Sequence, residues 1–102
     1  MNFGLALEEL KKGNKVKRSG WNGKNQYIEL AERVSYINSK GELINEGHLN
    51  IGNKVIAFIG TSGVQLGWLA SQADMLAEDW EIVKKYSPLI RIFFIVFSLV
   101  RH

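Results

Sequence analysis

The sequence contains no cysteine, and this absence excludes several kinds of chemistry. Without cysteine, the chain has no disulfide framework, no thiolate metal site and no cysteine nucleophile. Histidine is almost as scarce, because only His48 and His102 are present. Since histidine is the most frequent general base in enzymes, this scarcity argues against acid–base catalysis. His48 falls in a predicted loop, where a histidine is more often a surface residue than a catalyst.

Motifs that would indicate an enzyme are missing as well. The sequence has no glycine-rich phosphate loop followed by Lys-Ser or Lys-Thr. Ser62 lies in a Gly-Thr-Ser-Gly stretch whose spacing differs from that of a nucleophile elbow and whose composition is typical of a hairpin turn. The acids Asp74, Glu78 and Asp79 can in principle bind a metal, but neighbouring acids are more often solvated. We therefore expect no catalytic residue, no cofactor and no metal.

The sequence also lacks a clear targeting or membrane-spanning segment. Met1-Asn2 leads directly into an amphipathic pattern rather than a secretory signal. Together with the absence of cysteine, this favours the cytoplasm. The longest apolar run, residues 89–100, is interrupted only by Arg91 and Ser98, and it is shorter than the roughly 20 residues of a bilayer-spanning helix.

Three interpretations of this apolar run remain open. A packed or subunit-contacting strand or helix is favoured, because short apolar runs are usually buried. A contact with a membrane surface is less favoured. A chance or frame-altered tail, prone to aggregation, is the third interpretation.

The chain as a whole has the composition of one ordinary globular domain. Its 102 residues are 46% hydrophobic and 23% charged, which places it among folded proteins of modest core size. Small domains of this kind often gain stability by oligomerising. The first quarter of the chain is rich in basic residues, namely Lys11, Lys12, Lys15, Lys17, Arg18 and Lys24. They form either a solvated face or an anion-binding one, and they are too sparse for duplex nucleic acid but sufficient for a small phosphorylated ligand.

The local patterns predict two helices and several short strands. A helical stripe begins after Asn2 and ends at Gly13; it consists of Phe3, Ala6, Leu7 and Leu10. Strands are predicted at residues 15–18, 26–31, 34–37, 43–44, 55–60, 64–69 and 80–83. The fold class is therefore α+β, with a small antiparallel sheet, the N-terminal helix and a short second helix packed on it.

The second helix is predicted from the stretch GWLASQADMLAEDW, residues 67–80. Ser71 is a suitable N-cap, and Asp74, three residues later, completes a capping box. Helical spacing gives one apolar face, formed by Ala73, Leu76, Ala77 and Trp80. We therefore expect a capped helix that packs through Leu76 and Trp80.

Residues at the ends of these elements form a candidate nucleotide site. Trp21 and Trp68 lie at element ends, where ligand contacts concentrate, and an indole can stack on a nucleobase. Asn22 and Ser71 can hydrogen-bond to base edges or ribose hydroxyls. The alternative for each tryptophan is core packing. By residue type we favour core packing for Trp80 and leave both possibilities open for Trp21 and Trp68.

Charged groups near these residues extend the candidate site. The free N–H groups at the start of the second helix suit a phosphate, and Lys17, Arg18 or Lys24 can assist. Asp74 would repel a phosphate but can accept hydrogen bonds from ribose hydroxyls.

Two stretches of the sequence together resemble a known family. MNFGLALEELKKGNKVKRSGWNGKNQYI and GWLASQADMLAEDWEIV resemble the second family of Thoeris anti-defence proteins, which are small proteins of phages and prophages. The resemblance covers residues 1–30 and 64–83 well, and residues 31–63 only in general character. From about Tyr86 onward it finds no counterpart. We therefore expect one domain over residues 1–86, followed by an apolar tail, 87–102.

The resemblance implies a function that the residues alone do not. Members of this family bind and sequester the cyclic ADP-ribose-type (glyco-cyclic ADPR) signal of bacterial Thoeris immunity without cleaving it. The resemblance also implies a homotetramer with ligand pockets between subunits that acts in the cytoplasm of the infected cell. Carried onto this chain, the ligand-binding residues are Trp21, Asn22, Trp68, Ser71, Asp74 and Met75. A signal-degrading enzyme that uses Asp74 or Asp79, and a structural assembly module, are the alternatives.

Overall fold

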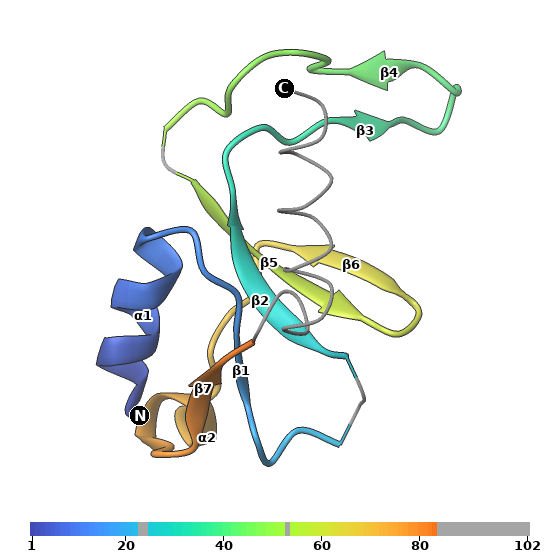
Figure 1. The fold of residues 1–102 in the computed structure, drawn as a ribbon. Coiled ribbons are helices and arrows are strands. Elements are labelled where there is room, and N and C mark those ends of the chain that lie inside the picture. The colour runs from blue at the N-terminus through green and yellow to red at the C-terminus, as the bar shows by residue number, and fades with distance from the viewer. Residues whose placement is uncertain (23–24, 53, 84–102) are drawn as a thin grey trace, which may run out of the picture.

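The computed structural model describes residues 1–22, 25–52 and 54–83, and it confirms the predicted α+β class (Figure 1). The elements in chain order are α1 (Phe3–Lys11), β1 (Val16–Arg18), β2 (Tyr27–Ala31), β3 (Tyr36–Ile37), β4 (Leu43–Ile44), β5 (Val55–Gly60), β6 (Gly63–Leu66), α2 (Gln72–Leu76) and β7 (Trp80–Ile82). Neither of these helices is long and apolar enough to cross a bilayer. The predicted apolar tail, 87–102, lies outside the described residues.

The strands form two antiparallel sheets. The larger sheet has the order β6-β5-β2-β1-β7, and its central pair, β2 and β5, is aligned from Tyr27↔Ile59 to Ala31↔Val55. The strands predicted at residues 34–37 and 43–44 are present as β3, which is shorter than predicted, and β4; the two pair in a separate two-stranded sheet at the end of the molecule distant from α2 (Figure 1). Because β7 pairs with β1, the last described strand lies beside the first.

Helix α1 begins and ends where the sequence predicts. The Asn2 side chain accepts a hydrogen bond from the backbone N–H of Leu5 at 2.9 Å, which satisfies one of the donors that every helix start leaves free. At the other end Gly13 has φ +91°, a left-handed conformation that glycine adopts without strain. Ala6 and Leu10 on the predicted stripe are fully buried.

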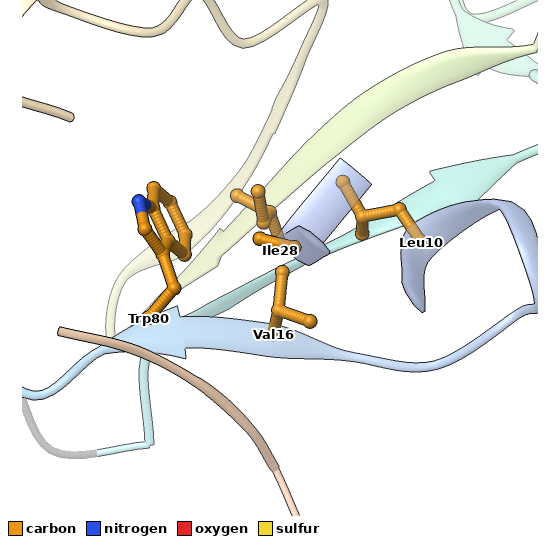
Figure 2. Close-up of a cluster of buried hydrophobic side chains, with 5 residues drawn as sticks. Leu10, Val16, Ile28 and Trp80 are labelled. Carbon is orange, nitrogen blue, oxygen red and sulfur yellow. The ribbon is translucent and has the colours of Figure 1, made fainter. Parts of the chain in front are cut away.

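The core lies between α1 and one face of the larger sheet. Leu10 from α1, Val16 from β1, Ile28 from β2 and Trp80 from β7 converge there (Figure 2), and Ala6 completes the buried cluster. Strand alternation explains this set, because alternate residues of each strand face the helix. We call this side of the larger sheet the inner face.

Helix α2 has the predicted cap but not the predicted contacts. The capping box between Ser71 and Asp74 is present. The helix ends at Leu76, however, and Ala77 is extended, so the helical period never reaches Trp80, which belongs to β7. Leu76 is 72% exposed, whereas Asp74 is only 9% exposed. The expectation that the helix packs through Leu76 and Trp80 is therefore wrong, because five helical residues are too few to carry an apolar stripe.

Two leucines that differ in burial test this arrangement. Leu10→Ala removes a fully buried side chain, and we expect the free energy of unfolding to fall by about 2–5 kcal/mol. The matched change Leu76→Ala is expected to alter it by no more than about 0.5 kcal/mol, because that side chain is exposed. Urea unfolding followed by tryptophan fluorescence measures both values. Equal losses in the two variants would contradict the described packing of α2.

Candidate functional site

The three tryptophans of the sequence meet in one aromatic cluster. The ring of Trp80 lies 5.4 Å from that of Trp21 and 6.3 Å from that of Trp68, and the latter two rings are 6.2 Å apart. Phe58 contacts Trp21 at 5.6 Å. All four pairs meet edge to face, a geometry that stabilises each pair by about 0.5–1.5 kcal/mol beyond the buried area. Trp80 is buried as predicted, while Trp21 and Trp68 pack against the core and remain partly accessible.

Tight backbone geometry places the two outer tryptophans. Trp21 follows the turn after β1, where its N–H donates to the carbonyl of Arg18 at 3.2 Å. Trp68 follows Gly67, which has φ +75°, and both residues donate their N–H groups to the carbonyl of Ile56. Each indole is thus held by a hydrogen-bonded turn rather than by a mobile connection. The prediction that both lie at element ends is confirmed.

An ion-pair network surrounds the cluster, centred on Arg18. Its Nε donates to Asp79 Oδ1 at 2.9 Å, and its Nη1 donates to Asp74 Oδ1 at 3.0 Å. The N–H of Gly20 donates to the second oxygen of Asp79 at 2.9 Å. A Cβ on Gly20 would lie 3.0 Å from that same oxygen, so any larger residue would push the Asp79 carboxylate away by a few tenths of an ångström. The network fixes the turn that carries Trp21.

Asp74 connects this network to the tryptophans. Its Oδ2 accepts from the backbone N–H of Ser71 at 2.9 Å, and its own N–H donates to Ser71 Oγ at 3.1 Å. The indole Nε1 of Trp80 donates to the carbonyl of Asp74 at 2.9 Å. One residue therefore caps α2, pairs with Arg18 and anchors the central tryptophan.

The pKa values of the network reflect these contacts. The Arg18 guanidinium holds the pKa of Asp79 below its usual range; burial opposes this to a lesser extent, and the Gly20 N–H adds a still smaller lowering effect. Burial raises the pKa of Asp74, but hydrogen bonds from Ser71, Arg18 and the Trp21 side chain together outweigh it and leave the pKa lowered. Asp79 and then Asp74 raise the pKa of Arg18. All three groups are ionised at neutral pH, so the network carries a net charge of about −1.

The other predicted residues are placed as follows. Lys17 lies on the opposite face of β1 from Arg18, as alternation predicts, and pairs with Glu81 at 3.5 Å. Asn22 and Met75 are exposed. Lys24 lies outside the described residues. The structure therefore joins one connected set, consisting of Arg18, Trp21, Trp68, Ser71 and Asp74, and separates Lys17 from it.

Asp79 is the main component of the network that the sequence interpretation missed. The expectation that Asp79, like other neighbouring acids, is solvated is wrong, because α2 ends before it and Arg18 binds it. A signal was present in the pattern of β1. Alternation placed Arg18 on the inner face, and an arginine on a packed face requires carboxylate partners.

The described residues include no group arranged as a metal site, and four surface hollows lie away from the tryptophan cluster. No group of three or more His, Cys, Asp or Glu side chains within ranges 1–22, 25–52 and 54–83 is arranged to hold a metal ion. Four surface hollows of about 250 to 550 Å³ are lined by residues of these ranges. Neither Trp21 nor Trp68 borders any of these four. The accessible parts of Trp21 and Trp68 therefore lie outside all four of these hollows.

Comparison with known proteins identifies the chain's relatives. Residues 1–83 match the family described as Tad2-like, a Thoeris anti-defense 2-like domain. A curated relative, Thoeris anti-defense 2 of Bacillus phage SP01, is 47% identical over 88 residues, covering 81% of this chain and 94% of that protein. The resemblance that the two end segments predicted is confirmed.

The lowered carboxylate pKa values predict an acid-sensitive contribution to stability. An aspartate in the unfolded chain has a pKa of about 3.9, and the pKa values of Asp74 and Asp79 in the folded protein are lower. The stability that these carboxylates contribute is therefore present above the unfolded pKa and is lost as pH falls through the folded pKa. Asp79→Asn should lower the urea midpoint at pH 7 and reduce its further fall between pH 5 and pH 3. The control, Glu78→Gln, should behave like the unsubstituted chain. Parallel pH profiles for all three proteins would exclude a stabilising role of the network.

Proposed function

The chain belongs to the Thoeris anti-defense 2-like family, and on that premise we propose that it binds and sequesters a cyclic ADP-ribose-type signal of Thoeris immunity, such as glyco-cyclic ADPR. The protein does not cleave this signal but keeps it from its effector inside the infected bacterial cell. The observation that carries the proposal is the 47% identity, over most of both chains, to a phage protein named Thoeris anti-defense 2.

The aromatic cluster supplies chemistry that suits a nucleotide. Trp21 and Trp68 are fixed 6.2 Å apart and remain partly accessible, so an indole face can stack on the adenine for about 1–3 kcal/mol. Asn22 and Ser71 are exposed and can hydrogen-bond to base edges or ribose hydroxyls. Asp74 uses one carboxylate oxygen for Arg18 and the other for Ser71. Since each carboxylate oxygen has two lone pairs, Asp74 can also accept from a ribose hydroxyl.

The state of the acids supports binding rather than cleavage. A general acid or base works best with a pKa near the operating pH. The pKa values of Asp74 and Asp79 are lowered, and both carboxylates are held by Arg18. Such groups are poor proton donors and weak bases at neutral pH. This favours sequestration over a signal-degrading enzyme.

The surroundings of the cluster support a pocket formed between subunits. Leu69, Met75 and Leu76 are 86%, 52% and 72% exposed, and they belong to the segment that carries Trp68 and α2. Several large apolar side chains left exposed in one segment are typical of a surface that a second subunit covers. Because the tryptophans border none of the four hollows, a facing subunit would also supply the missing pocket wall. We infer a homotetramer in which ligand pockets lie between subunits.

Sequestration and cleavage differ in what heating releases. The protein should remove the cyclic ADP-ribose-type signal from solution on incubation, because the signal is bound. Heating should then denature the protein and return the signal intact, as measured by chromatography of the filtrate. A degraded product after heating would show an enzyme, and no initial loss of free signal would show that the chain does not bind it.

The two outer tryptophans should contribute to binding more than the central one. Trp21→Ala and Trp68→Ala should each weaken binding by about 1–3 kcal/mol, or about 5- to 150-fold in Kd, in protein that is still folded. Trp80→Ala is the control, because it should lower the free energy of unfolding by about 3–5 kcal/mol. Melting curves and ligand titrations of all three variants measure this. Early melting with normal binding in both outer variants would show that the pocket lies elsewhere.

A further inference from the structure

The larger sheet has a second face, turned away from α1, that the core does not use. Strand pairing aligns two rows of side chains across β2, β5 and β6 on this face. We call it the outer face and define it by Tyr27, Ile59 and Val64 in one row and Glu29, Ala57 and Leu66 in the other. Five of these six side chains are apolar or aromatic, and Glu29 is the charged one.

Burial on the outer face is greatest at its centre. Ala57 is 4% exposed although it does not belong to the core cluster, whereas Val64 and Leu66 on the edge strand β6 are 61% and 46% exposed. A hollow of about 500 Å³ adjoins the outer face, and its lining includes Val55 and Leu66. The outer face is therefore an apolar surface whose central part is shielded.

Glu29 is the residue of this surface whose charge lacks a partner among the described residues. Its Oε2 is buried and has no hydrogen-bond partner among the described residues. Burying a carboxylate oxygen without a donor is costly, so a cation is expected beside it. The two described lysines on this side of β1 are engaged elsewhere: Lys15 contacts the hydroxyl and ring of Tyr27, and Lys17 pairs with Glu81.

The chain itself contains a segment of complementary chemistry. Residues 89–100 are apolar except for Ser98 and a single cation, Arg91. The segment lies beyond residue 83, where the family match ends. Twelve consecutive residues with one positive charge match an apolar surface with one carboxylate, of which one oxygen is buried without a hydrogen-bond partner.

The connection is long enough for this segment to reach the outer face. Strand β7 ends at Ile82, two strands away from β2, a separation of about 10 Å at about 4.8 Å per strand. Residues 83–88 can extend about 20 Å at roughly 3.3–3.6 Å per residue. The reach therefore exceeds the need by a factor of about two.

From these observations we infer that residues 89–100 dock on the outer face of their own chain, with the Arg91 guanidinium donating to the Glu29 carboxylate. The occupant is an intramolecular cover that shields the apolar rows and neutralises the Glu29 carboxylate. The aromatic cluster lies on the inner side, where Trp21 contacts Phe58, so the cover leaves it free. The inference does not depend on the proposed function.

Because the chain has no cysteine, single introduced thiols can report which surfaces are covered. In the full-length protein, Ala57→Cys places a thiol at the centre of the outer face, and Ser62→Cys places one in the exposed turn between β5 and β6. The rate of reaction with a maleimide reagent measures accessibility. We expect Ala57→Cys to react at least tenfold more slowly than Ser62→Cys, and this ratio should not change on hundredfold dilution.

Charge reversal then tests the pairing. Arg91→Glu should accelerate labelling of Ala57→Cys at least fivefold without changing that of Ser62→Cys, because two carboxylates would repel each other. Adding Glu29→Arg to the same protein should restore the slow rate. Near-UV circular dichroism of the tryptophans verifies that each variant is folded.

Four outcomes would overturn the inference. Labelling of Ala57→Cys as fast as Ser62→Cys would show that nothing covers the face. Protection that disappears on dilution would assign the cover to a second copy of the chain. Exposure of the thiol when phosphatidylcholine vesicles are added would assign the segment to a lipid surface. Failure of the double reversal to restore slow labelling would exclude the pair of Arg91 with Glu29.

Discussion

The pairing of Arg18 with two carboxylates is the interaction on which the candidate site depends. It joins Arg18 of β1 to Asp74 and Asp79, which lie 56 and 61 positions further along the chain. Asp74 in turn caps α2 and anchors the indole of Trp80, while Asp79 fixes the turn at Gly20. Each of these three charged side chains is partly buried, and leaving any of them without its partners would cost free energy. The network therefore favours one arrangement of the three segments that carry Arg18, Asp74 and Asp79. The positions of the tryptophans follow from that arrangement.

In the proposed function, the side chains of the aromatic cluster that stabilise the fold would also contact the ligand. Trp80 belongs to the core, and Trp21 and Trp68 extend the core toward solvent through edge-to-face contacts. Rings held in this way lose little conformational freedom when a ligand stacks on them, and such preorganisation strengthens binding. The sequence leaves core packing and ligand stacking equally open for these two residues, and the structure shows each indole packed against the core and partly accessible.

Features held by contacts within a few residues could be predicted from the sequence, and features held by contacts between distant segments could not. Helix α1 and the capping box of Ser71 were predictable because their contacts lie within a few residues. The contacts of α2 were not, because the helix stops at Leu76 and the apolar spacing that continued to Trp80 belongs to a strand. The partners of Arg18 were also not predictable in detail. Alternation showed that this residue faces inward, but only the fold brings Asp79 beside it.

The charge of the network constrains how a nucleotide can lie in the proposed site. Two carboxylates within 3.0 Å of Arg18 leave a local charge of about −1, so a phosphate placed beside Arg18 would also meet Asp74 and Asp79. Ribose hydroxyls, in contrast, can donate to Asp74. The favourable orientation therefore sets the base on the indoles and the sugar toward Asp74, with the phosphates directed away from the network. In this orientation Arg18 would act as a positioning residue that holds Asp74 and Asp79, and it would not contact the phosphates.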